Sequence, residues 1–252
     1  MHLKTLFTGL YLGLLTLILP ASAQNKPLTL VSFDYPPFMN VQEGKPATGL
    51  MIEVINEAFK RIGKPYKMEF YPLARDFQML DAGEADALFT VKKTPERETN
   101  YLFPKESVLS QDYVFFVLKD SPVEFKGDLK SLANASIGVV NKVSYGSVFD
   151  AAAQRGDFKK LEVAPTYEAN FKKLLAKRMD VVVCSRIPGF AFLKELNATQ
   201  QVKVIGPPIE TTQSYIMFSK KAGPALVAEF DKAMAAMRSD GTRAKLDKKY
   251  SE

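Results

Sequence analysis

Strand-like and helix-like segments alternate along this chain, and the alternation restricts the fold more than any other feature of the sequence. Residues 28–33 form a short apolar run typical of a strand, and apolar residues then recur at helical spacing over residues 54–62. Strand-like residues 67–71, helix-like residues 73–82 and strand-like residues 85–89 complete a βαβ succession. The sequence therefore predicts an α/β fold with a largely parallel sheet.

One sequence pattern occurs twice as a weak internal echo. Residues 80–89 and residues 174–183 share the same order of a helix end, a tight turn, an Asp and a buried strand. The repetition indicates two similar halves. Asp86 and Asp180 either form a pair of catalytic carboxylates or bond backbone amides at their own turns, and the second role is the usual one for Asp at such a turn.

Two stretches have the pattern of connections between those halves. A strand-like run at residues 112–118 leads into a polar segment with a proline, and Gly206-Pro207-Pro208 precedes a strand-like run and a final helix. We therefore expect a discontinuous first lobe, residues 24–119 plus 212–252, and a second lobe at residues 120–211. Two lobes joined by two strands form a cleft that closes about a hinge.

The first 23 residues have the composition of a secretory leader. Lys4 supplies a positive start, residues 6–19 are mostly apolar, and Pro20-Ala21-Ser22-Ala23 resembles a small-residue cleavage site. The apolar run is shorter than the roughly 20 residues that cross a bilayer. We expect a cleaved signal peptide (residues 1–23) and a mature protein in the periplasm, with a retained anchoring helix as the alternative.

The composition limits the chemistry of the mature chain. His2 is the only histidine and belongs to the leader, so no imidazole remains to act as a general base or metal ligand. Cys184 is the only cysteine, which excludes a disulfide within the chain. It follows three valines and is interpreted as a buried packing residue. We expect neither a metal nor another cofactor.

The charge is modestly basic. The formal net charge of +6 is spread along the chain as isolated lysine pairs and does not form a stripe with interleaved aromatic residues. Nucleic acid is therefore excluded as an expected partner. The surplus of positive charge helps to attract anionic solutes. We also expect the protein to be a monomer.

The sharpest chemical motif is Thr94-Pro95-Glu96-Arg97. Thr94 suits the N-cap of a helix and Pro95 the first helical position, so Arg97 falls in the first turn. A cation there opposes the helix dipole and requires a negative neighbour. Either a nearby acidic side chain supplies it, or the helix end and the guanidinium together receive an external carboxylate.

Five motifs in register carry a family resemblance. They are Tyr35-Pro36-Pro37-Phe38, the helix opening at residues 49–54, the turn at residues 83–87, Thr94-Pro95-Glu96-Arg97 and the ending at residues 237–242. Together they resemble the family 3 extracellular solute-binding proteins, the periplasmic receptors of polar amino acid ABC transporters. The resemblance covers the mature chain and implies the two-lobed type II periplasmic-binding fold, a small-molecule ligand and an inner-membrane permease as partner.

The same resemblance implies ligand-binding residues in the first lobe. Arg97 resembles the family arginine that clamps the ligand carboxylate, and Tyr35 and Phe38 resemble the aromatic wall of the cleft or are ordinary core residues. Leu73 stands where an aromatic residue is frequent, and Arg75 either reaches the ligand or pairs at the surface. Thr90, Lys92 and Thr94, which belong to the segment around the arginine, are further candidates.

In the second lobe, residues 138–147 resemble the loop that meets the ligand with backbone amides, and Ser144 and Tyr145 are the candidates there. Ser144 or Ser147 is predicted to cap the next helix and to point a second helix N-terminus into the cleft. A turn without ligand contact is the alternative.

The sequence departs from the family pattern where an acid normally holds the ammonium group of an amino acid. That position lies near Ser185, and the residues are Cys184-Ser185-Arg186, in which Arg186 repels an ammonium if it points inward. Asp34 or a rearranged loop has to compensate, or the ligand is a carboxylate without an amine. The alternatives to a transport receptor are a periplasmic enzyme similar to cyclohexadienyl dehydratase on the same fold, and a receptor that presents its ligand to a sensor.

Overall fold

The computed structural model describes residues 26–250, so the predicted leader lies outside the described residues. Within them, eight strands form one sheet in the order β2-β1-β3-β8-β4-β7-β5-β6. Their bounds are β1 Leu28–Ser32, β2 Tyr66–Phe70, β3 Ala87–Val91, β4 Leu109–Leu118, β5 Ser136–Val140, β6 Lys160–Ala164, β7 Val181–Ser185 and β8 Val202–Phe218. No helix in this part of the chain is both long enough and apolar enough to cross a membrane.

The predicted alternation of strands and helices is confirmed. β1 pairs in parallel with β2 and β3, and β5 pairs in parallel with β6 and β7, whereas the pairs that involve β4 or β8 are antiparallel. The helices are α1 Leu50–Ile62, α2 Leu73–Asp81, α3 Pro95–Asn100, α4 Ser147–Arg155, α5 Tyr167–Leu175, α6 Arg186–Glu195, α7 Gly223–Ser239 and α8 Thr242–Lys249, with 3₁₀ turns at Leu129–Leu132 and Lys220–Ala222.

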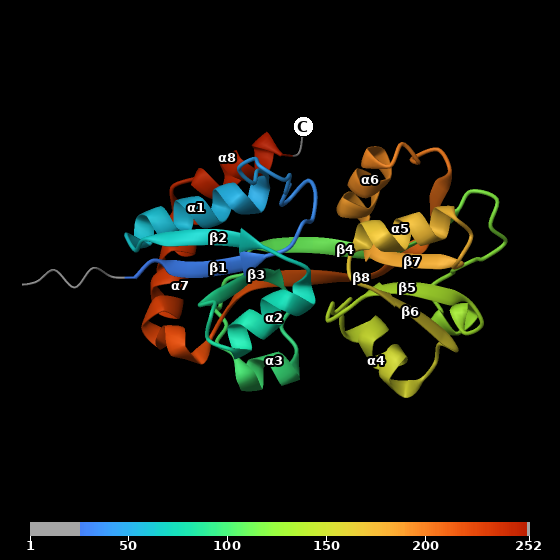
Figure 1. The fold of residues 1–252 in the computed structure, drawn as a ribbon, viewed down its shortest axis with the longest axis horizontal. Coiled ribbons are helices and arrows are strands. Elements are labelled where there is room, and N and C mark those ends of the chain that lie inside the picture. Colours follow the sequence, from blue (N-terminus) through green and yellow to red (C-terminus); the bar gives the residue numbers. More distant parts are fainter. Residues whose placement is uncertain (1–25, 251–252) are drawn as a thin grey trace, which may run out of the picture.

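Figure 1 shows two halves whose backbones are connected through β4 and β8 at the centre of the sheet. Lobe 1 contains β1–β3 with α1–α3, α7 and α8, and lobe 2 contains β5–β7 with α4–α6. Helices lie on both sides of the strands in each lobe, α1 and α8 opposite α2 and α3, and α5 and α6 opposite α4. The parallel strands of each lobe are thus covered by helices on both faces of the sheet, as continuous apolar strands require.

The two lobes share the long strands β4 and β8, which pair with each other from Leu109 to Leu118. β8 reaches β3 through its last residues, from Tyr215 onward, and β4 reaches β7 through Tyr113–Phe116. The passage from one lobe to the other therefore falls inside these strands. We propose that the lobes divide at about residues 119 and 212, just after β4 and within β8, and that the hinge lies in these paired strands.

The repeated helix-to-strand step has the local role that is usual for Asp. Asp86 accepts a hydrogen bond from the backbone N–H of Thr29 at 2.8 Å, and Asp180 accepts one from the backbone N–H of Ser136 at 2.8 Å. Each carboxylate therefore ties the turn before a buried strand to the neighbouring strand. The structural interpretation of both residues is confirmed.

Each lobe has an aromatic interior. In lobe 1, Phe230 of α7 lies 6.2 Å from the Phe59 ring of α1 and 5.8 Å from the Phe218 ring of β8, centroid to centroid. In lobe 2, Phe171 of α5 lies 5.3 Å from Phe116 of β4. Because aromatic residues bury large apolar areas, this packing stabilises a chain without disulfides.

One buried group opposes this stability. Asp76 lies on the α2 face that carries Leu73, Phe77 and Leu80, and its side chain is completely buried. Neither carboxyl oxygen has a hydrogen-bond partner among residues 26–250. Burial raises the pKa of Asp76 from 3.8 to about 9. The carboxyl is therefore protonated in the folded protein at neutral pH, because a charge in that place has no compensation.

Asp76→Asn should stabilise the protein at pH 7. The unfolded chain ionises this carboxyl near pH 3.8 and the folded chain only near pH 9, so the folded state binds more protons and the free energy of unfolding falls as pH rises between these values. The variant removes this dependence and gains up to about 4 kcal/mol at pH 7. Urea unfolding at pH 5 and pH 7 measures the difference. Asp120→Asn, at an exposed site, is the control, and an equal pH dependence in wild type and Asp76→Asn would contradict the assignment.

Candidate functional site

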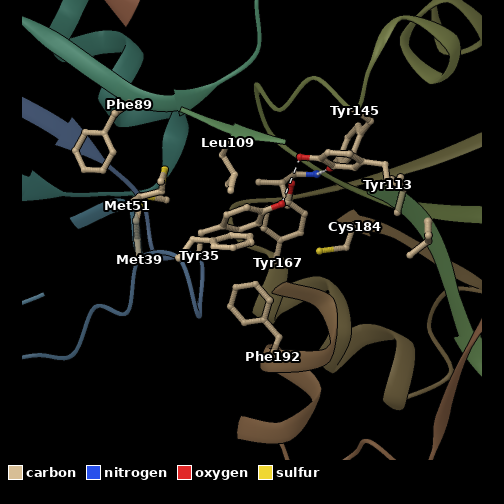
Figure 2. Close-up of a cluster of buried hydrophobic side chains, with 14 of the residues drawn as sticks. Tyr35, Met39, Met51, Phe89, Leu109, Tyr113, Tyr145, Tyr167, Cys184 and Phe192 are labelled. Atoms are coloured by element: carbon tan, nitrogen blue, oxygen red, sulfur yellow. Dashed lines mark hydrogen bonds between the residues drawn. The ribbon is translucent and has the colours of Figure 1, made fainter. Parts of the chain in front are cut away.

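Aromatic side chains from both lobes meet beside the crossing strands (Figure 2). The Tyr35 ring of lobe 1 lies 5.3 Å from the Tyr167 ring of lobe 2, and the Tyr35 and Tyr113 hydroxyls share a hydrogen bond at 3.3 Å. Tyr113 packs edge-to-face on Tyr145 at 5.8 Å, and Tyr167 stacks on Phe192 at 5.9 Å. We call these five residues the inter-lobe aromatic cluster. Burial raises the pKa of its tyrosines, so the hydroxyls remain neutral hydrogen-bonding groups.

Arg97 spans the two lobes. Thr94 caps α3 by accepting a hydrogen bond from the Arg97 backbone N–H at 3.2 Å, which fixes the first turn as predicted. The guanidinium Nη1 donates to the Lys92 carbonyl at 2.9 Å, and Nη2 donates across the interface to the Lys142 carbonyl of lobe 2 at 2.7 Å. The side chain also lies over the Phe77 ring, 5.0 Å from its centroid. Arg97 is only 9% exposed.

The guanidinium has neutral partners instead of a carboxylate. Both acceptors are backbone oxygens, and among the described residues Arg97 makes no ion pair, although Glu96 is its neighbour on α3. Burial lowers the pKa of Arg97, and the carboxylate of Asp150 acts on it from a distance in the opposite direction. Of the two predicted possibilities, a direct internal acid pair is therefore not formed, and the arginine can still receive an external anion.

Lys92 is a second buried cation beside Arg97. Its side chain is 6% exposed, and Nζ lies over the Tyr113 ring, 3.9 Å from the centroid. The segment before it has a bulge between Phe89 and Val91, where Thr90 adopts a positive φ of 68°. Burial and then the Arg97 charge lower the pKa of Lys92 to about 7. Backbone strain of this kind in a non-glycine residue is frequent at functional sites.

The opening of α4 differs from the prediction. Its N-cap is Gly146 without a side-chain cap, so the expectation that Ser144 or Ser147 caps this helix is wrong. Glu210, which lies in β8, supplies the negative charge: its carboxylate accepts from Ser147 Oγ and from the Val148 backbone N–H, both at 3.0 Å. Gly146 has a φ of +111°, which favours glycine, and a Cβ there would lie 2.4 Å from Glu210 Oε2.

Asp150 organises the loop before α4 in the same manner. It accepts hydrogen bonds from the Ser144 hydroxyl and from the Tyr145 backbone N–H, the latter at 2.9 Å. Tyr145 in turn accepts from the Val140 backbone N–H at 2.6 Å and is 2% exposed. The loop that resembles a ligand-binding loop is thus held by two carboxylates, Asp150 and Glu210.

Two cavities lie between the lobes. A cavity of about 500 Å³ is bounded by Lys92–Pro95 of lobe 1, by Ser144, Gly146, Ser147, Asp150, Ala151 and Gln154 of lobe 2, and by Glu210–Gln213 and Tyr215 of β8. A smaller one of about 190 Å³ is lined by Phe38, Ser110–Asp112 and Ser185–Ile187. A larger hollow of about 740 Å³ lies at the β2 edge beside α1, away from these groups.

The remaining predicted residues are placed less centrally. Phe38 is 6% exposed with its ring 6.2 Å from that of Tyr35, and Ser185 is buried at the smaller cavity. Leu73, the first residue of α2, is buried in the lobe 1 core. Arg75 is exposed and pairs with Glu84 at 3.3 Å, and Asp34 is exposed and accepts from the Val41 backbone N–H at 2.9 Å. The structure does not bring the last three side chains into the larger cavity.

Sequence reasoning missed five residues of this region: Tyr113, Asp150, Tyr167, Phe192 and Glu210. Asp150 had a usable signal, because an acid in the first turn of a helix is a common helix-start residue. Glu210 had no such signal in the sequence, because its role depends on the fold, which places this residue of β8 against Gly146.

Comparisons with known proteins give one consistent result. The family model described as bacterial extracellular solute-binding proteins, family 3, matches residues 29–252. The chain is 27% identical over 221 residues to PatH of Vibrio harveyi, named provisionally as an amino-acid ABC transporter-binding protein, with 86% of this chain and 84% of that protein covered. It is 25% identical over 205 residues to the L-cystine-binding protein TcyA of Bacillus subtilis strain 168, covering 81% and 72%.

Among solved structures, a histidine kinase sensor domain similar to periplasmic binding proteins superimposes with a TM-score of 0.80 at 20% identity, covering 90% of this chain and 96% of that one. An ancestral arginine-binding protein bound to arginine gives a TM-score of 0.77 at 22% identity, covering 89% and 97%. These likenesses show the fold, which is the two-lobed type II arrangement predicted from the sequence.

Lys92→Met should stabilise the protein most at pH 7 and below. The unfolded chain holds the lysine proton up to about pH 10.5 and the folded chain only to about pH 7, so the free energy of unfolding of wild type rises with pH between these values. The variant lacks this penalty and gains about 2–4 kcal/mol at pH 7, after the loss of the cation–π contact. Urea unfolding from pH 6 to pH 10 measures it, with exposed Lys126→Met as the control. A gain that does not shrink toward pH 10 would contradict the burial of an ionisable amine.

Proposed function

The chain belongs to family 3 of the bacterial extracellular solute-binding proteins, and on that premise we propose that it captures a small carboxylate-bearing solute between its lobes. The proposed ligand is a polar amino acid, delivered to an ABC permease of the inner membrane. PatH and TcyA, whose names describe amino-acid ABC transporter binding and L-cystine binding, support this choice. The proposed location is the periplasm, in agreement with the predicted leader and the extracellular family.

The observation that carries the proposal is the position of Arg97. Its guanidinium is buried, reaches from lobe 1 to lobe 2, and among the described residues has two carbonyl oxygens as hydrogen-bond acceptors and no carboxylate. A ligand carboxylate that replaces one of these carbonyls forms a charge-assisted hydrogen bond, which is roughly twice as strong as a neutral one. A guanidinium that is already paired with an internal carboxylate would gain nothing.

In this proposal, the binding of the ligand carboxylate to Arg97 is coupled to closure of the lobes. The inter-lobe aromatic cluster and the Arg97 contact with Lys142 exist only when the lobes are together, because their members come from both lobes. A ligand that contacts both lobes favours that arrangement, since a ligand shifts an equilibrium by its differential affinity for the two states. A permease then distinguishes the loaded receptor by the relative position of the lobes.

We propose a receptor and not an enzyme. A dehydratase of this fold needs a protonated carboxyl in the cleft as general acid. Asp76 is protonated at neutral pH, yet it lies on the buried face of α2 and does not line the cavities between the lobes. Incubation with prephenate or arogenate followed by product analysis separates the two functions, and turnover of either compound would contradict the proposal.

Arg97→Ala should lose ligand binding without loss of the fold. A thermal-stability screen with amino acids, dicarboxylates and amines identifies the solute, because a ligand of the native state raises the melting temperature. For that solute, calorimetric titration should give a dissociation constant near micromolar for wild type, about −8 kcal/mol, and at least about 30-fold weaker binding for the variant.

Arg75→Ala is the matched control for this experiment, since Arg75 is an exposed arginine of the same lobe. It should bind as wild type does. Unchanged affinity in Arg97→Ala, with a far-ultraviolet circular dichroism spectrum like that of wild type, would remove Arg97 from the site.

A further inference from the structure

The larger inter-lobe cavity has charges of opposite sign on its two walls. Lys92 and Lys93 stand on the lobe 1 side, and Asp150 and Glu210 stand on the side formed by α4 and β8. No ion pair joins the two walls within the part of the chain that the structure describes. The cavity therefore presents an electric dipole to whatever enters it.

Lys92 provides the positive end. It is 94% buried as a residue and lines the cavity, and it has an aromatic face but neither an ion-pair partner nor a hydrogen-bond acceptor for Nζ among the described residues. The Arg97 guanidinium is bonded to the carbonyl of the same residue and repels the amine. A carboxylate near Nζ relieves this repulsion and supplies the missing acceptor.

Glu210 and Asp150 provide the negative end. Each carboxylate accepts two hydrogen bonds from lobe 2, whereas two carboxylate oxygens offer about four acceptor sites. Both therefore keep unused acceptor capacity, and both line the cavity. Glu210 also occupies the N-terminus of α4, so a ligand anion placed there would meet a carboxylate instead of unpaired amides.

At the position where the sequence places it, an ammonium group would meet one carboxylate and neutral acceptors, among them Gln111 Oε1, which has no hydrogen-bond partner among the described residues. Ser185 is buried, and Arg186 beside it lines the smaller cavity, where the only carboxylate in the lining is Asp112. Asp112 accepts from the Thr211 hydroxyl at 2.5 Å. Asp34, the predicted substitute, is turned to its own loop.

We propose that Glu210, assisted by Asp150, holds the ammonium group of a dipolar ligand whose carboxylate lies toward Lys92 and the Arg97 guanidinium beside it. The inference rests on the proposed function, and it narrows the ligand class to compounds with an amine and a carboxylate at a spacing that fits a cavity of about 500 Å³. The site selects against plain dicarboxylates, because a second anion would face two carboxylates.

The test compares an amino acid with its des-amino analogue. The twenty protein L-amino acids are titrated calorimetrically into wild type, and the strongest binder is then compared with the carboxylic acid in which hydrogen replaces the amino group. Wild type should bind the amino acid at least about 30-fold more tightly than the des-amino acid, the effect of leaving a buried charge unpaired. Equal affinity for the two compounds overturns the inference without any variant.

Glu210→Gln identifies the residue. The glutamine carbonyl can still accept from the Val148 N–H, so the first turn of α4 keeps this contact, while the charge is lost. The 30-fold preference should fall below about 5-fold, with the affinity for the des-amino acid nearly unchanged. A purely structural role would weaken both compounds equally, and that result overturns the inference. Glu229→Gln, at a lobe 1 carboxylate paired with Lys64, should retain the wild-type preference.

The outcomes separate the two proposals. If Arg97→Ala loses binding and Glu210→Gln keeps the preference for the amino acid, the assignment of Glu210 is wrong and the receptor function stands. If wild type binds none of the amino acids or small carboxylates, the receptor function fails, and the dipolar site fails with it.

Discussion

The pairing of β4 with β8 is the constraint on which the rest of the structure depends. These strands belong to both lobes, pair antiparallel over the full length of β4, and hold β3 on one side and β7 on the other. Because each lobe is built on the same two strands, a small change of twist in this ribbon moves one lobe relative to the other. The ribbon also forms part of the candidate site, since Glu210–Gln213 and Tyr215 of β8 line the larger cavity.

The electrostatics of the site follow from this arrangement. Lys92 directly follows β3, and Arg97 lies in the first turn of α3. The acids opposite them, Asp150 and Glu210, come from α4 and β8. Burial in the lobes lowers the pKa of both cations. The carboxylates of Asp150 and Glu210 each accept a hydrogen bond from a backbone amide of lobe 2. The protein thus keeps uncompensated charge in its interior at a cost in stability, a pattern that is typical of binding sites.

Much of the fold was predictable from the chain, because the strands and helices follow local patterns. Helix 73–82 and strand 67–71 are found within one residue of their predicted bounds, and Gly63 adopts the left-handed conformation at the end of α1. The strand predicted at 85–89 begins two residues later, since Asp86 is engaged with the Thr29 amide. The N-cap Thr94 and the buried Cys184 also follow from local sequence.

The site was less predictable, because its partners are distant along the chain. Thr94 and Arg97 form one local motif, but nothing near Arg97 indicates that its second acceptor is the carbonyl of Lys142. Likewise, no local rule predicts that Glu210 lies against Gly146, or that Asp76 is buried without a hydrogen-bond partner among the described residues.

The tyrosines of the inter-lobe aromatic cluster also determine how the protein fluoresces. The sequence contains no tryptophan, so ultraviolet emission from the protein is tyrosine emission, and the rings of Tyr35, Tyr113 and Tyr167 change surroundings whenever the lobes separate. The chain thereby carries its own spectroscopic probe of opening, with no dye attached.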